Sequence, residues 1–202
     1  MIGRVLAVVP TYRPDPDELA SLVEALIAQA DEVVVADDAS PCTADDPLRR
    51  LSTLGAYVVR HDRNAGIARS LNAGLAKAAD LGMDWLLTVD QVQQARDLYT
   101  QVENVLGPAG VGAVAAGSID DASGQLSYPM HLLDGIPVTH EVIQTGTLWS
   151  VIALLAVGGF DERLAIDAVD AAACLHLREA GYHVVLAADA AIGHHVGSGR
   201  QV

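Results

Sequence analysis

The first half of the chain alternates between short apolar runs and segments whose apolar residues recur at helical spacing. The run RVLAVV at 4–9 is continuous and of strand length, which is typical of a parallel strand covered on both faces. Asp15, Pro16 and Glu18 then supply a helix N-cap, a first-turn proline and a capping-box acid. Further strands are predicted at 32–38, 56–61 and 84–90, and further helices at 45–54 and 67–82.

The second half, after Gly107, has a looser pattern. The alternation as a whole predicts right-handed crossovers and an α/β fold with a mostly parallel central sheet and helices on both faces. Ligands of such a sheet bind at the C-terminal ends of the strands. In this half we expect strands at 111–117, about 141–150 and 183–188, and helices at 151–157 and from about 167 to 180.

Composition narrows the classes of protein to which the chain can belong. With 202 residues, 51% of them apolar, the chain can bury a continuous core, and we expect a single globular domain. The formal net charge is −14 and only 12 residues are Lys or Arg, which argues against a nucleic-acid polymer as partner. A nucleotide stays compatible with an acidic protein because a divalent cation can bridge its phosphates to carboxylates.

The cysteines and the apolar runs bear on the compartment. Cys42 and Cys174 form no C-x-x-C motif, so reduced cytosolic thiols are expected. The apolar run near the N-terminus is interrupted by Pro10 and is too short for a signal peptide, and the run from Val151 is too short for a membrane span. The sequence therefore predicts a soluble, cytoplasmic protein without a transmembrane segment.

Polar residues stand at the predicted C-terminal ends of four strands. If the strands are parallel, these residues all lie at one edge of the sheet. At Asp37-Asp38 there are two interpretations: a carboxylate that accepts the N–H of a nucleobase or a ribose hydroxyl, or a strand end followed by a capping turn. The strand-end residues are Pro10-Thr11-Tyr12, Asp37-Asp38, the segment from His61 to Gly66, and Asp90.

The segment RNAGIARSLNAG, at 63–74, has features of an anion site. Asn64 and Gly66 lie in a predicted turn before a helix N-terminus, where free backbone N–H groups and the helix dipole favour an anion. Arg69 and Asn72 are three residues apart, so they are neighbours on the helix and add polar side chains there. The alternative is ordinary capping beside a solvated helix face.

Several segments together resemble the catalytic domain of glycosyltransferase family 2, which has the GT-A type of α/β fold. The matching segments occur in the family's order across nearly the whole chain. Within the family, DQ at the fourth strand end, the IDxVD arrangement and the late H-x-x-G are similar to the bacterial rhamnosyltransferase branch. The segments are VVPTYRP, VVVADDAS, DRNAGIARSLNAG, LLTVDQ, QTGTLWS, GGFDE with LAIDAVDAAACLHLREAGY, and IGHHVG.

The resemblance implies roles for particular residues in binding a nucleotide sugar. The segment at 10–12 would lie beside the base, and Asp38, in preference to Asp37, would hold the base or the ribose. Asp90 would open an aspartate-x-aspartate motif that holds the ribose and a divalent metal bridging the diphosphate. The nucleotide-sugar-binding residues implied in this way are Pro10, Thr11, Tyr12, Asp38, Asn64, Gly66, Arg69, Asp90 and Gln91.

The activity that the resemblance implies is inverting transfer of a sugar, with rhamnose favoured, from dTDP-rhamnose or a UDP-sugar to a glycan or lipid-linked acceptor of the cell envelope. Mg²⁺ or Mn²⁺ would neutralise the diphosphate leaving group, and a carboxylate would act as general base on the acceptor hydroxyl. The nucleotide would bind at 1–106 and the acceptor at 107–202. Such an enzyme could also contact the inner face of the membrane peripherally. A nucleotidyltransferase is disfavoured because no glycine-rich phosphate loop follows the first strand.

Candidates for the base and for further ligands come from the second half. Asp170 is favoured as base with Asp167 close by on one face of a helix start, although an N-cap and a first-turn acid are the alternative. Strand alternation allows at most one of His194 and His195 to face the site, and the family spacing favours His194 as metal ligand over a mere surface pair. Trp149 would line the acceptor side or be buried in the core.

The chain departs from the family pattern in two places. Val92 stands where the motif would have its second aspartate, and valine cannot coordinate a metal. Three explanations remain: metal held by Asp90 and His194 with waters, a nucleotide-binding module with impaired or metal-free function, or an altered segment. Relatives of this branch usually continue with a basic, partly helical tail, whereas this sequence ends at Val202, so an enzyme that needs the tail would be incomplete here.

Overall fold

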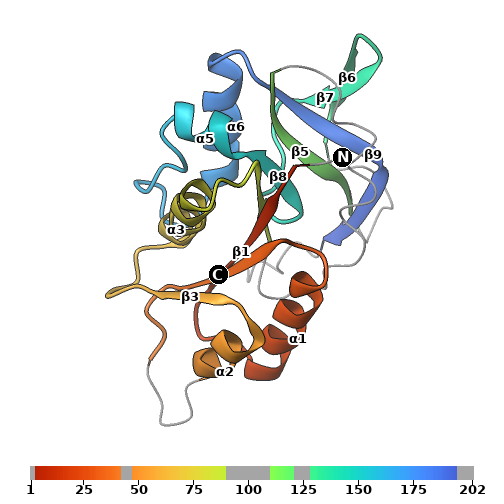
Figure 1. The fold of residues 1–202 in the computed structure, drawn as a ribbon. Helices are drawn as coiled ribbons and strands as arrows, with labels where there is room; N and C mark the ends of the chain where they lie inside the picture. The colour runs from red at the N-terminus through yellow and green to blue at the C-terminus, as the bar shows by residue number, and fades with distance from the viewer. Residues whose placement is uncertain (1–2, 42–46, 90–109, 121–127, 195–202) are drawn as a thin grey trace, which may run out of the picture.

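Nine strands form one sheet with helices against both of its faces (Figure 1). The structure is a computed structural model that describes residues 3–41, 47–89, 110–120 and 128–194. The strands are β1 (Val5–Thr11), β2 (Glu32–Asp37), β3 (Tyr57–Arg60), β4 (Trp85–Thr88), β5 (Val111–Asp120), β6 (Met130–Leu133), β7 (Ile136–Thr139), β8 (Thr147–Ser150) and β9 (His183–His194). The helices are α1 (Pro16–Ile27), α2 (Pro47–Leu54), α3 (Ile67–Asp80), α5 (Val151–Ala156) and α6 (Val169–Glu179).

The strand order in the sheet is β3-β2-β1-β4-β8-β5-β9-β7-β6. The first four strands are parallel, with β1 between β2 and β4 and with β3 on the far side of β2. β8 is antiparallel to both of its neighbours, β4 and β5, while β5 and β9 are parallel. The predicted α/β fold is therefore confirmed, but the sheet is mixed and not mostly parallel. The parallel pairs lie mainly in the first half, and the pairs of β8 and β7 with their neighbours are antiparallel.

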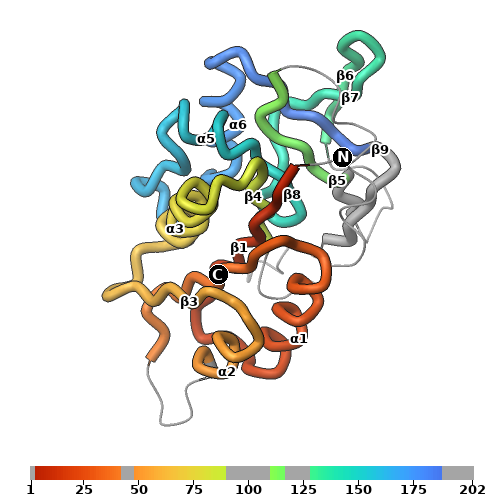
Figure 2. The backbone as a smooth tube through the Cα atoms, in the orientation of Figure 1, coloured from red at the N-terminus to blue at the C-terminus, as the bar shows by residue number. Residues whose placement is uncertain are grey.

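Side-chain alternation along the strands creates a core on each face of the sheet. Val5, Ala7 and Val9 of β1 pack on the side of α1 and α2. Leu6 and Val8 of the same strand point to the opposite side, where α3, α5 and α6 cover the sheet. Figure 2 shows α1 and α2 together on one side of β1 and the other three helices on the other. All seven residues of β1 are buried, as its continuous apolar run predicts.

Local signals fix the ends of the helices that follow the first strands. The Asp15 side chain caps α1, because its Oδ1 accepts hydrogen bonds from the N–H groups of Asp17 and Glu18, each at 3.0 Å. Gly82 lies just beyond α3 with φ of 65°, a conformation that favours glycine and stops the helix. The predicted N-cap and glycine stop are thus confirmed.

Two expectations for the second half need correction, and one element was missed. The strand expected at 141–150 is confined to β8, because the residues before it form the turn at Gly146, which has φ of 70°. The helix expected from about 167 begins at Val169, because Ala168 before it is in the left-handed conformation with φ of 62°. The hairpin of β6 and β7 was not predicted.

None of the helices in the described ranges is long and apolar enough to cross a membrane.

Cys174 of α6 provides a test of the packed core. Its side chain is fully buried, and burial is the main cause that raises the pKa of the thiol to about 12. Thiol reagents attack the thiolate, so we expect Cys174 to be unreactive in the folded protein. In a Cys42→Ser variant, whose single thiol is Cys174, Ellman's reagent at pH 8 should detect no fast-reacting thiol until denaturant is added. Rapid reaction of the folded variant would contradict this packing.

Candidate functional site

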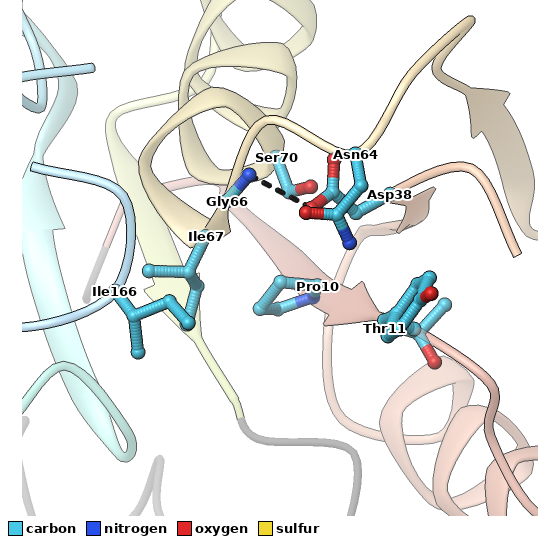
Figure 3. Close-up of a pocket in the computed structure, with 9 residues that line it drawn as sticks. Pro10, Thr11, Asp38, Asn64, Gly66, Ile67, Ser70 and Ile166 are labelled. Carbon is cyan, nitrogen blue, oxygen red and sulfur yellow. Dashed lines mark hydrogen bonds between the residues drawn. The ribbon is translucent and has the colours of Figure 1, made fainter. Parts of the chain in front are cut away.

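A cavity of about 220 Å³ opens at the C-terminal ends of the first strands. Pro10 and Thr11 come from the end of β1, Asp38 follows β2, and Gly66 precedes α3. Figure 3 shows Ile67 and Ile166 on one side of this space and Thr11 on the other. Six of the residues predicted to bind a nucleotide sugar therefore line one cavity. Its full lining is Pro10, Thr11, Tyr12, Asp38, Asn64, Gly66, Ile67, Ser70 and Ile166.

Asp38 connects the end of β1 to the loop before α3 by hydrogen bonds. Its Oδ1 accepts a hydrogen bond from the Ala65 N–H at 2.8 Å. Its Oδ2 accepts one from the Gly66 N–H, also at 2.8 Å (Figure 3). Its own N–H donates to the carbonyl oxygen of Thr11 at 2.8 Å. Asp38 is only 6% exposed, yet each carboxylate oxygen keeps a second lone pair for a ligand. The residue thus fixes the loop before α3 and remains able to accept a hydrogen bond.

Three backbone N–H groups around the start of α3 have acceptors within the protein. Asp38 accepts from the N–H groups of Ala65 and Gly66, and the carbonyl oxygen of Ala165 accepts from the Ile67 N–H at 2.8 Å. An anion bound at this helix start would therefore use other donors than these three. The anion beside this helix start is the carboxylate of Asp38, which is where the helix dipole favours negative charge.

Asp37, directly before Asp38, has a different role. Its side chain is fully buried, and its Oδ2 accepts hydrogen bonds from Nε of Arg60 and from the Ser40 N–H, each at 3.0 Å. These bonds fix the turn after β2 and join it to β3. Asp38 but not Asp37 lines the cavity, in agreement with the preference for Asp38.

Arg69 lies outside this cavity, in a neighbouring one. A second cavity of about 520 Å³ is lined by Arg63, Asn64, Ala65, Arg69 and Glu162. Asn64 borders both cavities. Nη2 of Arg69 lies 3.1 Å from Oδ1 of Asp62, and the hydrogen bond from Arg69 is the main cause that lowers the pKa of the Asp62 carboxyl.

Asn72 holds a loop in place. Its Nδ2 donates to the carbonyl oxygen of Phe160 at 2.8 Å and to Oε1 of Glu162 at 2.9 Å. Its Oδ1 accepts from the Phe160 N–H at 2.9 Å. The interpretation of Asn72 as an extra polar group of an anion site was therefore wrong, because its amide is occupied by the loop that follows α5.

Three residues of the cavity were not predicted. Ile67 and Ser70 are three residues apart on α3, so they lie on the same face of the helix. This spacing can be seen in the sequence. Ile166 lies in a loop far along the chain. The hydrogen bond from the Ile67 N–H to the carbonyl oxygen of Ala165 holds this loop beside the cavity. No local pattern in the sequence places Ile166 there.

The two candidate base residues lie differently with respect to α6. Asp170 is in the first turn of the helix, half-buried, and its Oδ2 accepts from the Gln144 N–H at 3.1 Å. Asp167 is exposed and precedes the left-handed Ala168, outside the helix. The expected common helical face and the alternative N-cap role of Asp167 are thus both wrong, while Asp170 is the expected first-turn acid.

Trp149 contributes to the core behind these residues. Its side chain has no exposed surface, it packs edge-to-face on Phe160 at 5.4 Å between ring centroids, and its Nε1 donates to Oγ1 of Thr88 at 2.9 Å. Thr88 in turn donates from Oγ1 to the carbonyl oxygen of Gln144, whose N–H binds Asp170. The expected acceptor contact of Trp149 is replaced by its alternative core role, from which it supports the segment beside Asp170.

The predicted metal site lies mostly outside the described residues. Asp90, Gln91, Val92 and His195 are outside them, and His194 is placed only as the last residue of β9. Within the described ranges, no group of three or more His, Cys, Asp or Glu side chains is arranged to hold a metal ion.

The fold is an α/β fold of the GT-A type. Residues 6–115, more than half of the chain, match the family described as Glycosyl transferase family 2. The chain belongs to this family and is a glycosyltransferase, so the predicted family and class of enzyme are confirmed.

Particular relatives agree with this assignment. A dTDP-rhamnosyl transferase, RfbF of Shigella flexneri, is 26% identical over 211 residues, which cover 98% of this chain and 71% of the relative. The structure of GalNAc-T7 with UDP, GalNAc and Mn²⁺ superposes with a TM-score of 0.75 at 14% identity, over 96% of this chain and 44% of that one. Glucosyl-3-phosphoglycerate synthase of Mycobacterium tuberculosis gives a TM-score of 0.65 at 15% identity, over 99% and 74% of the two chains. These structures confirm the GT-A fold.

Proposed function

We propose that the chain transfers a sugar, rhamnose in the first instance, from a nucleotide-diphosphate donor to a glycan or lipid-linked acceptor with inversion. The observation that carries the proposal is the cavity at the ends of β1 and β2, which gathers six residues implicated in nucleotide-sugar binding. The dTDP-rhamnosyl transferase relative favours dTDP-rhamnose over a UDP-sugar as donor.

In this proposal the nucleoside occupies the cavity beside Asp38. Pro10 and Ile67 offer apolar surface to the base, and the carboxylate of Asp38 accepts from the base or the ribose. Asn64 borders both cavities and Arg69 lines the second one, where the rest of the donor would bind. The nucleotide would therefore contact mainly the half at 1–106, with Ile166 as a wall residue from the second half, and the acceptor would bind in the half at 107–202.

Asp170 is the proposed general base. The acceptor oxygen attacks the anomeric carbon, its proton passes to the Asp170 carboxylate, and the bond to the diphosphate breaks with its electron pair leaving on the diphosphate. The N–H of Gln144 holds one carboxylate oxygen in a fixed direction. Asp167, exposed on the preceding turn, lies close in sequence and would contact the acceptor.

Mg²⁺ or Mn²⁺ is the proposed cofactor, held by Asp90 and His194 together with waters. Such an ion supplies neutralisation of charge on the diphosphate leaving group. Solved GT-A neighbours include one with Mn²⁺ and UDP-glucose bound. Because Val92 cannot coordinate an ion, the alternative is a nucleotide-binding module with impaired catalysis.

A panel of nucleotide sugars, tested by calorimetry with and without Mn²⁺ and then for turnover, distinguishes these proposals. We expect dTDP-rhamnose to bind best, binding to strengthen with Mn²⁺, and turnover to be lost in Asp90→Ala. Binding without turnover, with activity or metal affinity restored by Val92→Asp, would assign the impaired module. Absence of binding by every nucleotide sugar would refute the proposed site.

A further inference from the structure

Ser70 carries an unused hydroxyl in the wall of the strand-end cavity. It lies on α3 one turn after Ile67, is 0% exposed, and lines the cavity together with Asp38 (Figure 3). Among the described residues its Oγ has no hydrogen-bond partner. A serine inside a helix often returns its hydroxyl to a carbonyl three or four residues earlier, and Ser70 does not.

An unpaired buried hydroxyl opposes folding, because it has lost its water and gained no partner. Alanine at this position would keep the helix and avoid that cost. Asp38 accepts from two backbone N–H groups and receives no hydrogen bond from Ser70, and Thr11 and Tyr12 also have partners. The hydroxyl of Ser70 is therefore able to donate a hydrogen bond to a ligand in the cavity.

We propose that Ser70 is a specificity-determining residue that donates a hydrogen bond to a carbonyl oxygen of the donor's nucleobase. The inference rests on the proposed function and deepens it. Rotation about the Cα–Cβ bond of Ser70, between staggered positions, turns the hydroxyl into the cavity. Pro10, Ile67 and Ile166 supply apolar surface suited to a flat ring, and the volume of about 220 Å³ suits a single heterocycle.

Asp38 and Ser70 bring an acceptor and a donor to one cavity, and this pair selects among bases that bind with ring position 3 toward Asp38. Uracil and thymine present a ring N–H next to a carbonyl, so Asp38 can accept from the N–H while Ser70 donates to the oxygen. Cytosine has a ring acceptor in place of that N–H, which would face the Asp38 carboxylate without a proton between them. Its amino N–H and ring nitrogen can pair with Asp38 and Ser70 only if the ring shifts within the cavity. The pair therefore predicts binding of uridine or thymidine diphosphate in preference to cytidine diphosphate.

The test compares wild-type protein with Ser70→Ala and with Ser52→Ala, a control on the exposed side of α2. Calorimetry gives the Kd of TDP, UDP and CDP, and the melting temperature is measured without ligand. We expect Ser70→Ala to weaken TDP and UDP binding by about 3- to 10-fold, the loss of one neutral hydrogen bond. The same change should raise the melting temperature of the free protein. Ser52→Ala should leave nucleotide binding unchanged and raise the melting temperature by less, through helix propensity alone.

The opposite signs separate ligand recognition from a structural role, which would lower affinity and melting temperature together. If wild type binds TDP and Ser70→Ala binds it equally well, the inference about Ser70 is wrong while the nucleotide site stands. CDP binding as tight as TDP binding would overturn the selection of base. If wild type binds no nucleotide at all, the proposed function itself falls, and the role of Ser70 falls with it.

Discussion

Asp170→Asn should lower the rate of sugar transfer by about 10²- to 10⁴-fold, the usual contribution of a general base, while nucleotide binding stays unchanged. Asparagine has the shape of aspartate but cannot take the proton of the acceptor hydroxyl. The amide oxygen of asparagine can still accept a hydrogen bond from the Gln144 N–H, as Asp170 does in the wild-type protein. Turnover with donor and acceptor in excess, together with donor affinity by calorimetry, measures the two effects separately.

The control for this substitution is Asp80→Asn, which removes the same charge at an exposed position in the last turn of α3. We expect full turnover there, because the acidic chain loses one of many carboxylates far from the proposed base. Retention of more than about a tenth of the activity in Asp170→Asn would rule out its role as base. Asp167→Asn would then be the next variant to measure.

The first half of the fold was predictable because its signals are local. Continuous apolar runs give the parallel strands, and Asp15 and Gly82 mark helix ends through side-chain capping and a positive φ. In the second half the pattern of apolar residues does not match the pattern of burial. All four residues of β6 are exposed, so the period of buried residues is missing there. The turn Asp134-Gly135, with φ of 51° and 84°, is nevertheless a hairpin signature that the sequence displays.

The candidate site was predictable where residues follow parallel strands, since the topology brings strand ends to one edge. Pro10 and Asp38 meet for this reason. What the sequence concealed is which groups already satisfy each other. Asp38 occupies donors 27 and 28 residues further along the chain, and Ala165 occupies the Ile67 N–H from still further away. Pairings of this kind depend on the folded loops, and no local periodicity encodes them.

The second large effect is expected at Gly66, where the first half of the chain meets the loop that carries Ile166. Gly66 has φ of 93°, which L side chains rarely adopt, and a Cβ there would collide with the backbone carbonyl of Ala165. Its N–H must also stay in place to reach Asp38. We expect Gly66→Ala to lower the free energy of unfolding by roughly 2–5 kcal/mol, from backbone strain and overpacking together, as measured by urea denaturation.

Gly55→Ala separates the two causes. Gly55 has φ of 106°, but a Cβ added there would meet no atom within 4 Å. We therefore expect this variant to lose only about 1–2 kcal/mol, from backbone strain alone, with nucleotide affinity unchanged. Gly66→Ala should in addition weaken nucleotide binding, because relief of the clash moves Ala165 and Ile166 away from α3. If both variants lose the same free energy of unfolding, the loop at Ala165 moves without cost when a Cβ is added at Gly66. The contact between Gly66 and Ala165 would then not fix this wall of the cavity.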